Sequence, residues 1–358
     1  MHRGGSGSAG ENLRFLSARG AQNPRKPPYD IAMGKASRTK QDVDRRARIA
    51  AQREAERRAE QRKRIYLGGG AVLAVVIVVV AFVLVKLNSS PGTAPVASNG
   101  PTGTALTAVT KQVTEIPASV TDKVAGGGVN TGIFVAATTT SAISSVASQL
   151  GSYFATVNGT ALTSNGKPEL LFLGGEYCPY CAAERWAMIS ALSRFGTFTG
   201  LATSHSSTSD VYPDTPTYTF TKAKYTSSYL TFTSVEEFSN ERIGNSNNSN
   251  TAYQTLQTAT AAEEALAQAY DPDGAIPFLD LGNKYVEVGN LSPLTPSMLQ
   301  GKTWAQVAAA MNDPSSSLGK ALVGNANYLT AGICKLTNNL PASACTPTIQ
   351  QLEAQLAV

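Results

Sequence analysis

The sequence predicts an α/β (α+β) domain that follows a single transmembrane helix. Three observations lead to this class. An uncharged apolar run extends from Ile65 to Val85, the sign of the net charge changes across that run, and a short apolar strand ends in glycine just before a Cys-x-x-Cys motif and a helical pattern. A chain of 358 residues suits one or two domains.

The 21-residue run from Ile65 to Val85 has the length of a membrane span, because a hydrocarbon core about 30 Å thick needs about 20 helical residues. Its β-branched residues would favour a strand in water, but an isolated strand cannot satisfy its backbone groups in lipid. The run begins too late and is too long for a cleaved signal peptide. We therefore expect a transmembrane helix over 65–87.

The charges give this span an orientation. Residues 1–64 carry 17 Lys/Arg and 7 Asp/Glu, a net of +10, whereas the remaining 13 Lys/Arg and 18 Asp/Glu give a net of −5. The positive-inside rule then predicts a single-pass cell-membrane protein with a cytoplasmic N-terminus and an extracytoplasmic domain. This division excludes a uniformly basic nucleic-acid-binding protein.

Two segments flank the span. Residues 1–64 read as a cytoplasmic basic head, disordered at first and then a charged helix over 40–64, with Met33 as an alternative start. That helix fits a topology determinant resting on anionic headgroups better than a nucleic-acid binder. Residues 88–105 read as a flexible linker, and the extracytoplasmic domain is expected over 106–358.

Strands and helices alternate along this domain. Apolar runs predict strands, apolar residues at three-residue steps predict helices, and Gly282-Asn283 predicts a hairpin turn. The expected strands are Glu169–Gly174, Phe198–Thr203, Tyr229–Thr233, Ile276–Leu281 and Lys284–Val288, and the expected helices are Cys181–Phe195, Thr251–Tyr270, Pro296–Met311 and Leu318–Leu329.

The chemistry is concentrated in the motif Cys178-Pro179-Tyr180-Cys181, which follows the Glu169–Gly174 strand and opens a helix. Unpaired N–H groups and the positive dipole end at a helix N-terminus stabilise a thiolate. We expect Cys178 to be the exposed thiol and Cys181, one turn later, to be the buried resolving thiol. Pro179 suits the first helical turn, where its missing N–H is not needed.

A second signal is Ile276-Pro277, 96 residues after Cys181 and at the start of an expected strand. Thiol oxidoreductases of one fold require a proline there. A cis Ile276–Pro277 bond would bring the chain back against Cys178 and leave backbone groups free to hold a substrate as an added strand.

The segment Glu176–Trp186, with Ala-Ile-Pro-Phe downstream, resembles the thioredoxin-like superfamily and, more narrowly, an uncharacterised membrane-anchored family, domain-of-unknown-function family 929. The resemblance covers roughly residues 105–355. It implies a thioredoxin-like domain with a Cys178 nucleophile, a resolving Cys181 and a cis Pro277. This chain departs from the pattern in a long Ser/Thr/Tyr-rich insert between the strand near Phe198 and Pro277. Because the family is uncharacterised, the resemblance to it implies no activity, and the direction of electron flow stays open.

The other two cysteines, Cys334 and Cys345, are expected to form a structural disulfide, because an even number of cysteines outside the membrane favours bridges. Two alternatives stay open at this point. The pair could relay electrons to Cys178 and Cys181, or all four cysteines could bind zinc. The spacing of the second pair is too wide for a zinc knuckle, so no metal site is expected.

Several other side chains are candidates of lesser weight. Glu184 offers a proton-transfer group, although it and Arg185 are expected to be surface ions on the helix. Glu176 could tune Cys178 or be a solvated loop acid, and Trp186 is expected in the core. His205 is the only histidine after the apolar run, so the sequence offers almost no histidine for a Ser-His-Asp hydrolase or a His-rich metal site.

The function expected is that of a membrane-anchored thiol–disulfide oxidoreductase acting on exported or membrane proteins. The cysteines are themselves the redox centre, so no cofactor is implied, and a membrane redox partner must reset the pair. No nucleic acid is expected as a partner. Two alternatives are a thioredoxin-like binding or assembly module with structural cysteines, and a metallochaperone presenting Cys178 and Cys181 to copper or to a haem-assembly client.

Overall fold

A seven-stranded mixed sheet forms the centre of the protein in the computed structural model, which describes residues 100–136, 153–244 and 252–356. These residues all belong to one unit, Thr93–Val358. The expected basic head, the expected transmembrane helix and the linker up to residue 99 lie outside the described residues. Within the described ranges, no helix has the length and apolar character needed to cross a bilayer.

The central sheet has the strand order β1-β2-β13-β12-β4-β3, and β9 pairs with β4 on the side away from β12. β9 runs parallel to β4, whereas β12 and β13 form an antiparallel hairpin beside it. The strands are β1 (Phe134–Ala136), β2 (Tyr153–Thr156), β3 (Thr163–Ser164), β4 (Lys167–Gly174), β9 (Thr231–Glu236), β12 (Phe278–Leu281) and β13 (Tyr285–Val288).

The register of β4 and β12 positions the site. Phe278, the first residue of β12, pairs with Leu173 near the end of β4. The chain that leaves β4 toward Cys178 therefore starts beside the chain that enters β12 through Ile276 and Pro277. Two segments almost 100 residues apart in sequence meet at this edge of the sheet.

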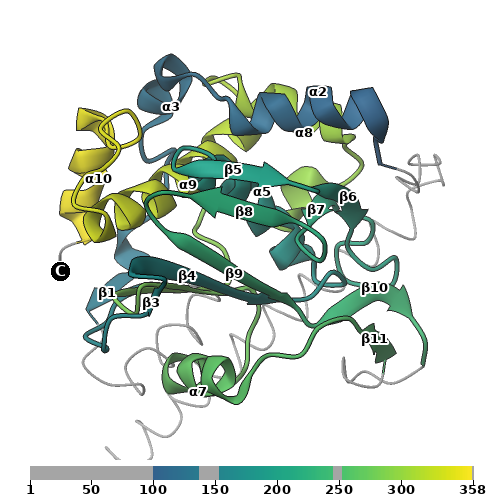
Figure 1. Ribbon diagram of the computed structural model, residues 1–358. Coiled ribbons are helices and arrows are strands. Elements are labelled where there is room, and N and C mark those ends of the chain that lie inside the picture. Colours follow the sequence, from purple (N-terminus) through teal and green to yellow (C-terminus); the bar gives the residue numbers. More distant parts are fainter. Residues whose placement is uncertain (1–99, 137–152, 245–251, 357–358) are drawn as a thin grey trace, which may run out of the picture. The chain divides into compact units, whose positions relative to one another are not determined.

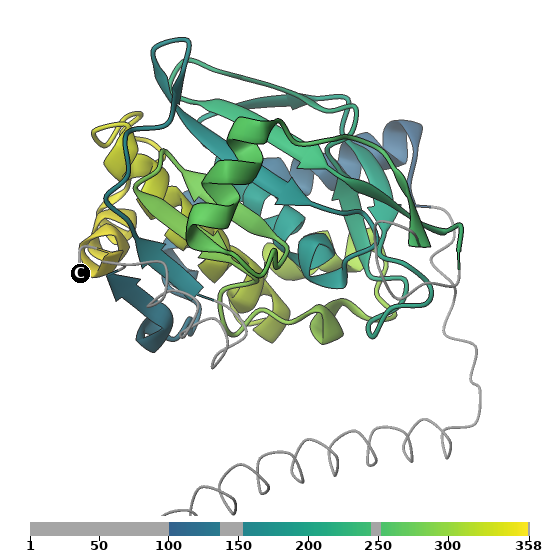
Figure 2. The ribbon, with the colours of Figure 1, turned by 90° about the horizontal axis from the view of Figure 1, so that it is seen from below.

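β4 is apolar on both faces because both faces of the sheet are covered. Leu170 and Phe172 face the larger core, and Leu171 and Leu173 face a smaller one. Helices α5 and α9 cover the first face, and α7 lies against the second (Figures 1 and 2). These helices are α5 (Pro179–Leu192), α7 (Ala261–Tyr270) and α9 (Ser317–Leu336).

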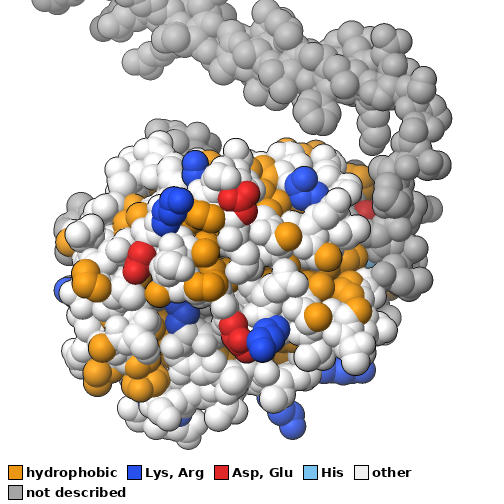
Figure 3. All heavy atoms as spheres, turned by 90° about the horizontal axis from the view of Figure 1, so that it is seen from above, with side chains coloured by type: hydrophobic (Ala, Val, Ile, Leu, Met, Phe, Trp, Pro, Cys, Tyr) orange, Lys and Arg blue, Asp and Glu red, His pale blue; other side chains and the backbone are white. Residues whose placement is uncertain are grey.

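Four further helices complete the layer on the larger core. They are α2 (Gly103–Thr114), α3 (Ala118–Val124), α8 (Trp304–Met311) and α10 (Pro347–Leu356). In the view of this side in Figure 3, charged side chains are few and stand apart among polar and apolar ones. Because α2 begins at Gly103, the last three residues expected in the linker lie in a helix.

The helix that follows the motif is buried on almost every side. The expected apolar positions Trp186, Ile189 and Leu192 are indeed buried, but so are the residues between them, and only Tyr180 is exposed. α5 packs against α9 and β7 as well as the sheet. The expectation that Glu184 and Arg185 are surface ions is therefore wrong.

The insert differs from its prediction. The strand expected over Phe198–Thr203 is interrupted at Gly200, where φ is +74°. Neither piece joins the central sheet, because each pairs with another strand of the insert. The two small sheets so formed contain β5 (Gly196–Thr199) with β8 (Lys224–Ser227), and β6 (Ala202–His205) with β7 (Pro216–Thr219).

The helix expected over Thr251–Tyr270 begins later than predicted. β11 (Tyr253–Thr255) pairs instead with β10 (Phe238–Arg242), and α7 starts only at Ala261. The start is fixed by a capping box, in which the Thr260 hydroxyl accepts the Glu263 N–H and the Glu263 carboxylate accepts the Thr260 N–H. The alanine content of this segment correctly predicted a helix, but it did not indicate the residue at which the helix begins.

The hairpin around Gly282-Asn283 is confirmed. Both residues have positive φ, +67° and +53°, as a two-residue turn with a right-handed twist requires. The helix expected over Pro296–Met311 is broken into η2 (Pro296–Leu299) and α8, and α9 extends beyond the predicted Leu318–Leu329.

Cys334, near the end of α9, forms a disulfide with Cys345, just before α10. Leu336 packs against Gly282, so the bridge lies near the turn end of β12. Pro277 and Cys178 lie at the other end of that strand. The two cysteine pairs thus lie toward opposite ends of β12, an arrangement that fits the expected structural role of the bridge.

Replacing both Cys334 and Cys345 by Ala should destabilise the domain. The bridge closes a loop of sequence separation 11, so its removal should lower the free energy of unfolding by about 2–3 kcal/mol in the chain-entropy model. Denaturant unfolding of the two proteins measures this. Under reducing conditions the difference should vanish, and a gap that persists there would assign the loss to packing instead.

Candidate functional site

Cys178 is the N-cap residue of α5, at the end of a short turn that leaves β4. Its N–H donates to the Gly175 carbonyl at 3.2 Å, which closes the turn. Its Sγ accepts the N–H of Cys181 at 3.4 Å. Pro179 occupies the first turn of the helix, where its missing N–H costs nothing. The sulfur therefore lies where the unpaired N–H groups of the helix point.

The segment entering β12 covers this sulfur. The Ile276–Pro277 peptide bond is cis, and the Ile276 carbonyl accepts a hydrogen bond from Cys178 Sγ at 3.7 Å. The Pro277 carbonyl already accepts the N–H of Gly289. Of the two residues expected to hold a substrate backbone, Ile276 is thus the one left with backbone groups to offer.

Cys178 is only 6% exposed and Cys181 is fully buried. The expectation of an exposed Cys178 is therefore wrong. The N-cap position turns its sulfur toward the helix axis, and the Ile276–Pro277 segment lies over it. Cys178 is still the more accessible of the two thiols, so an approaching sulfur would meet it first.

The two thiols differ in acidity. Burial tends to raise the pKa of Cys178, but hydrogen bonds from the Cys181 thiol and from the N–H groups of Cys181 and Tyr180, with the charge of Arg185, bring it below its ordinary value. Burial raises the pKa of Cys181 well above its ordinary value, and the neighbouring Cys178 raises it further. Cys178 is thus favoured as thiolate and Cys181 as thiol.

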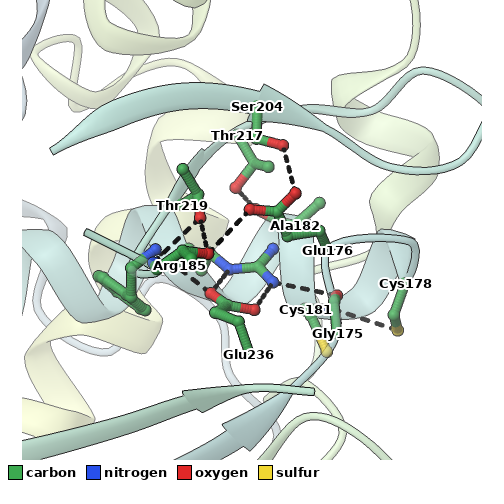
Figure 4. Close-up of polar contacts among 12 residues, drawn as sticks. Gly175, Glu176, Cys178, Cys181, Ala182, Arg185, Ser204, Thr217, Thr219 and Glu236 are labelled. Carbon is green, nitrogen blue, oxygen red and sulfur yellow. Dashed lines mark hydrogen bonds and ion pairs between the residues drawn. The ribbon is translucent and has the colours of Figure 1, made fainter. Parts of the chain in front are cut away.

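Arg185 provides the positive charge beneath the motif (Figure 4). Its Nε and Nη2 donate to the two carboxylate oxygens of Glu236 on β9, at 2.7 and 2.5 Å, and Nη2 also donates to the Gly175 carbonyl at 3.0 Å. Both side chains are fully buried. One cation therefore joins α5, the central sheet and the turn before Cys178.

Sequence reasoning missed this pair, although a signal for it exists. α5 carries apolar residues on all its faces, and such a helix is buried all round. A charge within it must then be buried with a partner. The partner itself, Glu236, lies 51 residues away and could be identified only from the fold.

Glu184 lies in a second buried polar cluster, between α5 and α9. Its Oε2 accepts the side-chain amides of Asn290 and Asn325 at 3.0 and 2.7 Å. The Asn290 amide also donates to the Tyr180 carbonyl within the motif, at 3.0 Å. Burial raises the pKa of Glu184 to about 7 despite these bonds. The pKa of the neighbouring Glu287 is also raised, by burial and by Glu184.

The remaining candidates stand away from the sulfur. The Glu176 carboxylate accepts the hydroxyls of Thr221 and Ser204, at 3.2 and 3.5 Å, which makes it a partner of the insert rather than a free loop acid. Trp186 is fully buried, as expected, and its indole donates to the Pro216 carbonyl at 2.8 Å. His205 is near Asp214, with 3.4 Å between Nδ1 and Oδ1.

Aromatic side chains surround the motif. Tyr177 stacks on Tyr253 of β11 with 4.5 Å between ring centroids, and Tyr180 meets Tyr212 of the insert edge to face at 6.1 Å. No group of three or more His, Cys, Asp or Glu able to hold a metal ion occurs in the described part of the chain. The reactive groups that the structure places at the motif are the thiols of Cys178 and Cys181.

Comparison with known families matches residues 153–335 to the domain of unknown function DUF929. The match includes the central strands from β2 to β13, the motif and most of α9. No curated protein and no solved structure matches the chain. The narrower resemblance inferred from the motif is thereby confirmed.

The role of Arg185 can be tested by removing both charges of the buried pair, as in R185M/E236Q, which leaves no unpaired ion. The pKa of Cys178 should rise, because one of the causes that lower it is gone. The pH profile of Cys178 alkylation, followed by mass spectrometry, should shift to higher pH. K111M/E115Q, which removes both charges of an exposed ion pair of α2, is the control. An unshifted R185M/E236Q profile would show that the helix N-terminus alone acidifies Cys178.

Glu184 should make stability depend on pH. Its pKa is raised from 4.5 to about 7 in the folded state, so its stabilising contribution is complete below about pH 4.5 and is lost as the pH rises through about 7. The loss corresponds to roughly 3 kcal/mol. Denaturant unfolding at pH 5 and pH 8 should therefore show a smaller fall for E184Q than for the wild type.

The exposed Glu115 provides the matched control, because E115Q removes a carboxylate that is not buried. E115Q should keep the wild-type dependence on pH. If E184Q also kept it, Glu184 would not be the buried acid that takes up the proton on folding.

Proposed function

The chain belongs to the DUF929 family, and we propose that this member is a membrane-anchored thiol–disulfide oxidoreductase working through Cys178 and Cys181. One observation carries the proposal. The Cys178 sulfur caps α5, accepts the Cys181 N–H and lies against the Ile276 carbonyl, at the edge where β4 ends and β12 begins. This is an arrangement in which a thiolate and a thiol of unequal pKa share one helix turn.

The order of elements supports a thioredoxin-like domain. β4, α5 and the parallel β9 are followed by the antiparallel hairpin of β12 and β13 and then by α9. The four strands lie in the order β9-β4-β12-β13, with the motif after the first of them in sequence and the cis proline before the third. We propose that these elements form the thioredoxin-like core and that β5–β8 and β10–α7 are insertions into it.

The proposed reaction exchanges one disulfide for another. The Cys178 thiolate attacks a sulfur of the client disulfide, the client S–S bond breaks, and the released client thiolate takes a proton. Cys181 then loses its proton and attacks Cys178 Sγ, which releases the second client thiol and leaves a Cys178–Cys181 disulfide. Two electrons pass from the cysteines to the client, one of the two protons that the client gains comes from Cys181 and the other from solvent, and the reverse sequence oxidises a client dithiol.

Burial of the resolving thiol gives this sequence an order. The pKa of free Cys181 is raised by burial and by its neighbour Cys178. Formation of a mixed disulfide at Cys178 consumes the thiolate that opposes ionisation of Cys181. Cys181 is therefore restrained until the mixed disulfide forms and then ionises more readily, which allows it to resolve that disulfide.

The setting of this activity is also part of the proposal. The span at 65–87 would anchor the chain in the cell membrane with the domain outside. Exported or membrane proteins would be its clients, and a membrane redox partner would reset the pair, because each turnover leaves the cysteines in the opposite state.

A second candidate function is favoured by one observation, the 6% exposure of Cys178. A thioredoxin-like binding or assembly module would hold a partner beside Ile276 and Pro277 and keep both cysteines structural. In that case a Cys178–Cys181 bond would resist reduction.

The redox potential of each pair separates the two functions. The full chain in detergent is equilibrated in dithiol buffers, quenched by alkylation and read per cysteine by mass spectrometry. We expect Cys178/Cys181 between roughly −120 and −270 mV, as in working exchange proteins, with Cys334/Cys345 below about −300 mV as the internal reference. A motif potential below about −300 mV would favour the binding module.

A further inference from the structure

A groove lies on the sheet face opposite α5, beside the motif. It has a volume of about 410 Å³ and is bounded by α7, by the start of β10 and by the segment that enters β12. Its apolar floor contains Leu173, near the end of β4, and its register partner Phe278. The volume falls in the range of ligand sites, at its lower end.

Two residues of the groove wall are neighbours of Cys178. Tyr177 directly precedes it, and the carbonyl of Ile276 lies 3.7 Å from its Sγ. The Ile276 N–H makes no hydrogen bond with any described residue and is available to a bound backbone. A polypeptide whose cysteine meets Cys178 therefore passes over the mouth of the groove.

The groove is acidic. Glu237, Glu264 and Asp271 line it, and no Lys, Arg or His among the described residues does. None of the three makes an ion pair with another described residue. The pKa of Glu237 is raised by burial and then by the charge of Glu264, so the two carboxylates oppose each other across the groove. A bound cation would relieve this repulsion.

We propose that the groove binds a basic side chain, Lys or Arg, of the client polypeptide, close in sequence to the cysteine exchanged at Cys178. This inference rests on the proposed oxidoreductase function and names its substrate class: exported polypeptides with a cationic residue flanking the cysteine.

The shape and chemistry of the groove suit such a side chain. The aliphatic stem of Lys or Arg packs on an apolar surface while its charged end stays with polar partners. Here the stem would lie over Leu173 and Phe278, with the charged end toward Glu237 and Glu264. The three carboxylates are not part of any group of the described residues that could hold a metal ion, which favours an organic cation.

Matched substrates test the proposal. Two disulfide-bonded peptides are compared that differ only at one residue near the cysteine, Arg in one and its neutral isostere citrulline in the other. With the full chain in detergent, the Arg peptide should be exchanged with a kcat/KM about tenfold higher, the size of one charge-assisted hydrogen bond. In E237Q/E264Q and at high salt the preference should fall toward one.

E115Q/E241Q is the control variant, because it removes two exposed carboxylates that do not line the groove. It should retain the preference for Arg. Glu264 is exposed, and E264Q alone should reduce the preference for the Arg peptide in part. This single variant keeps the test valid if E237Q/E264Q does not fold.

The outcomes separate the two proposals. Exchange of both peptides at equal rates would overturn the basic-residue inference and leave the oxidoreductase function intact. The C178S/C181S variant, titrated with cysteine-free Arg and citrulline peptides by fluorescence anisotropy, gives a readout without catalysis. Arg-selective binding there without any exchange by the wild type would support the groove and refute the oxidoreductase function.

Discussion

The buried ion pair of Arg185 and Glu236 is the interaction on which the site depends. It fixes α5 to β9, and its third hydrogen bond holds the Gly175 carbonyl in the turn that leads to Cys178. Breaking such a pair from one side leaves an uncompensated charge in the interior, at a cost of roughly 3–5 kcal/mol. The same guanidinium that organises the turn also favours the Cys178 thiolate. One side chain therefore both organises the turn and contributes to the acidity of the Cys178 thiol.

Two consecutive residues of α5 lie in opposite electrostatic environments. Arg185 faces the sheet and a carboxylate, whereas Glu184 faces α9 and two amides. Asn290 connects the second environment back to the Tyr180 carbonyl, so the motif is held by polar contacts from both the sheet side and the helix side. The cysteines thus lie on a support whose polar contacts come from distant segments of the chain, and these contacts fix the position of the Cys178 sulfur.

Local patterns predicted much of this structure. The β4 strand, the motif helix and the hairpin at Gly282-Asn283 each depend on residues close in sequence, and each was correct. The burial of Glu184 and Arg185 was missed because it depends on α9 and β9, which no local pattern places. The strand near Phe198 was predicted as one strand and is two, and its partners could not be predicted because a short polar strand carries no information about its partner. The acidic groove joins three separated segments and was also invisible in the sequence.

The pairing of β2 with β13 has a consequence for how the protein is made. Tyr153 lies opposite Val288, so the sheet includes contacts between residues more than 130 positions apart. Closing such long loops before gaining their contacts slows folding. The sheet is incomplete until synthesis has passed β13, and the disulfide and α10 follow later still. The nascent domain therefore stays incomplete while the first 288 residues of the chain emerge, and β2 lacks its β13 partner until then.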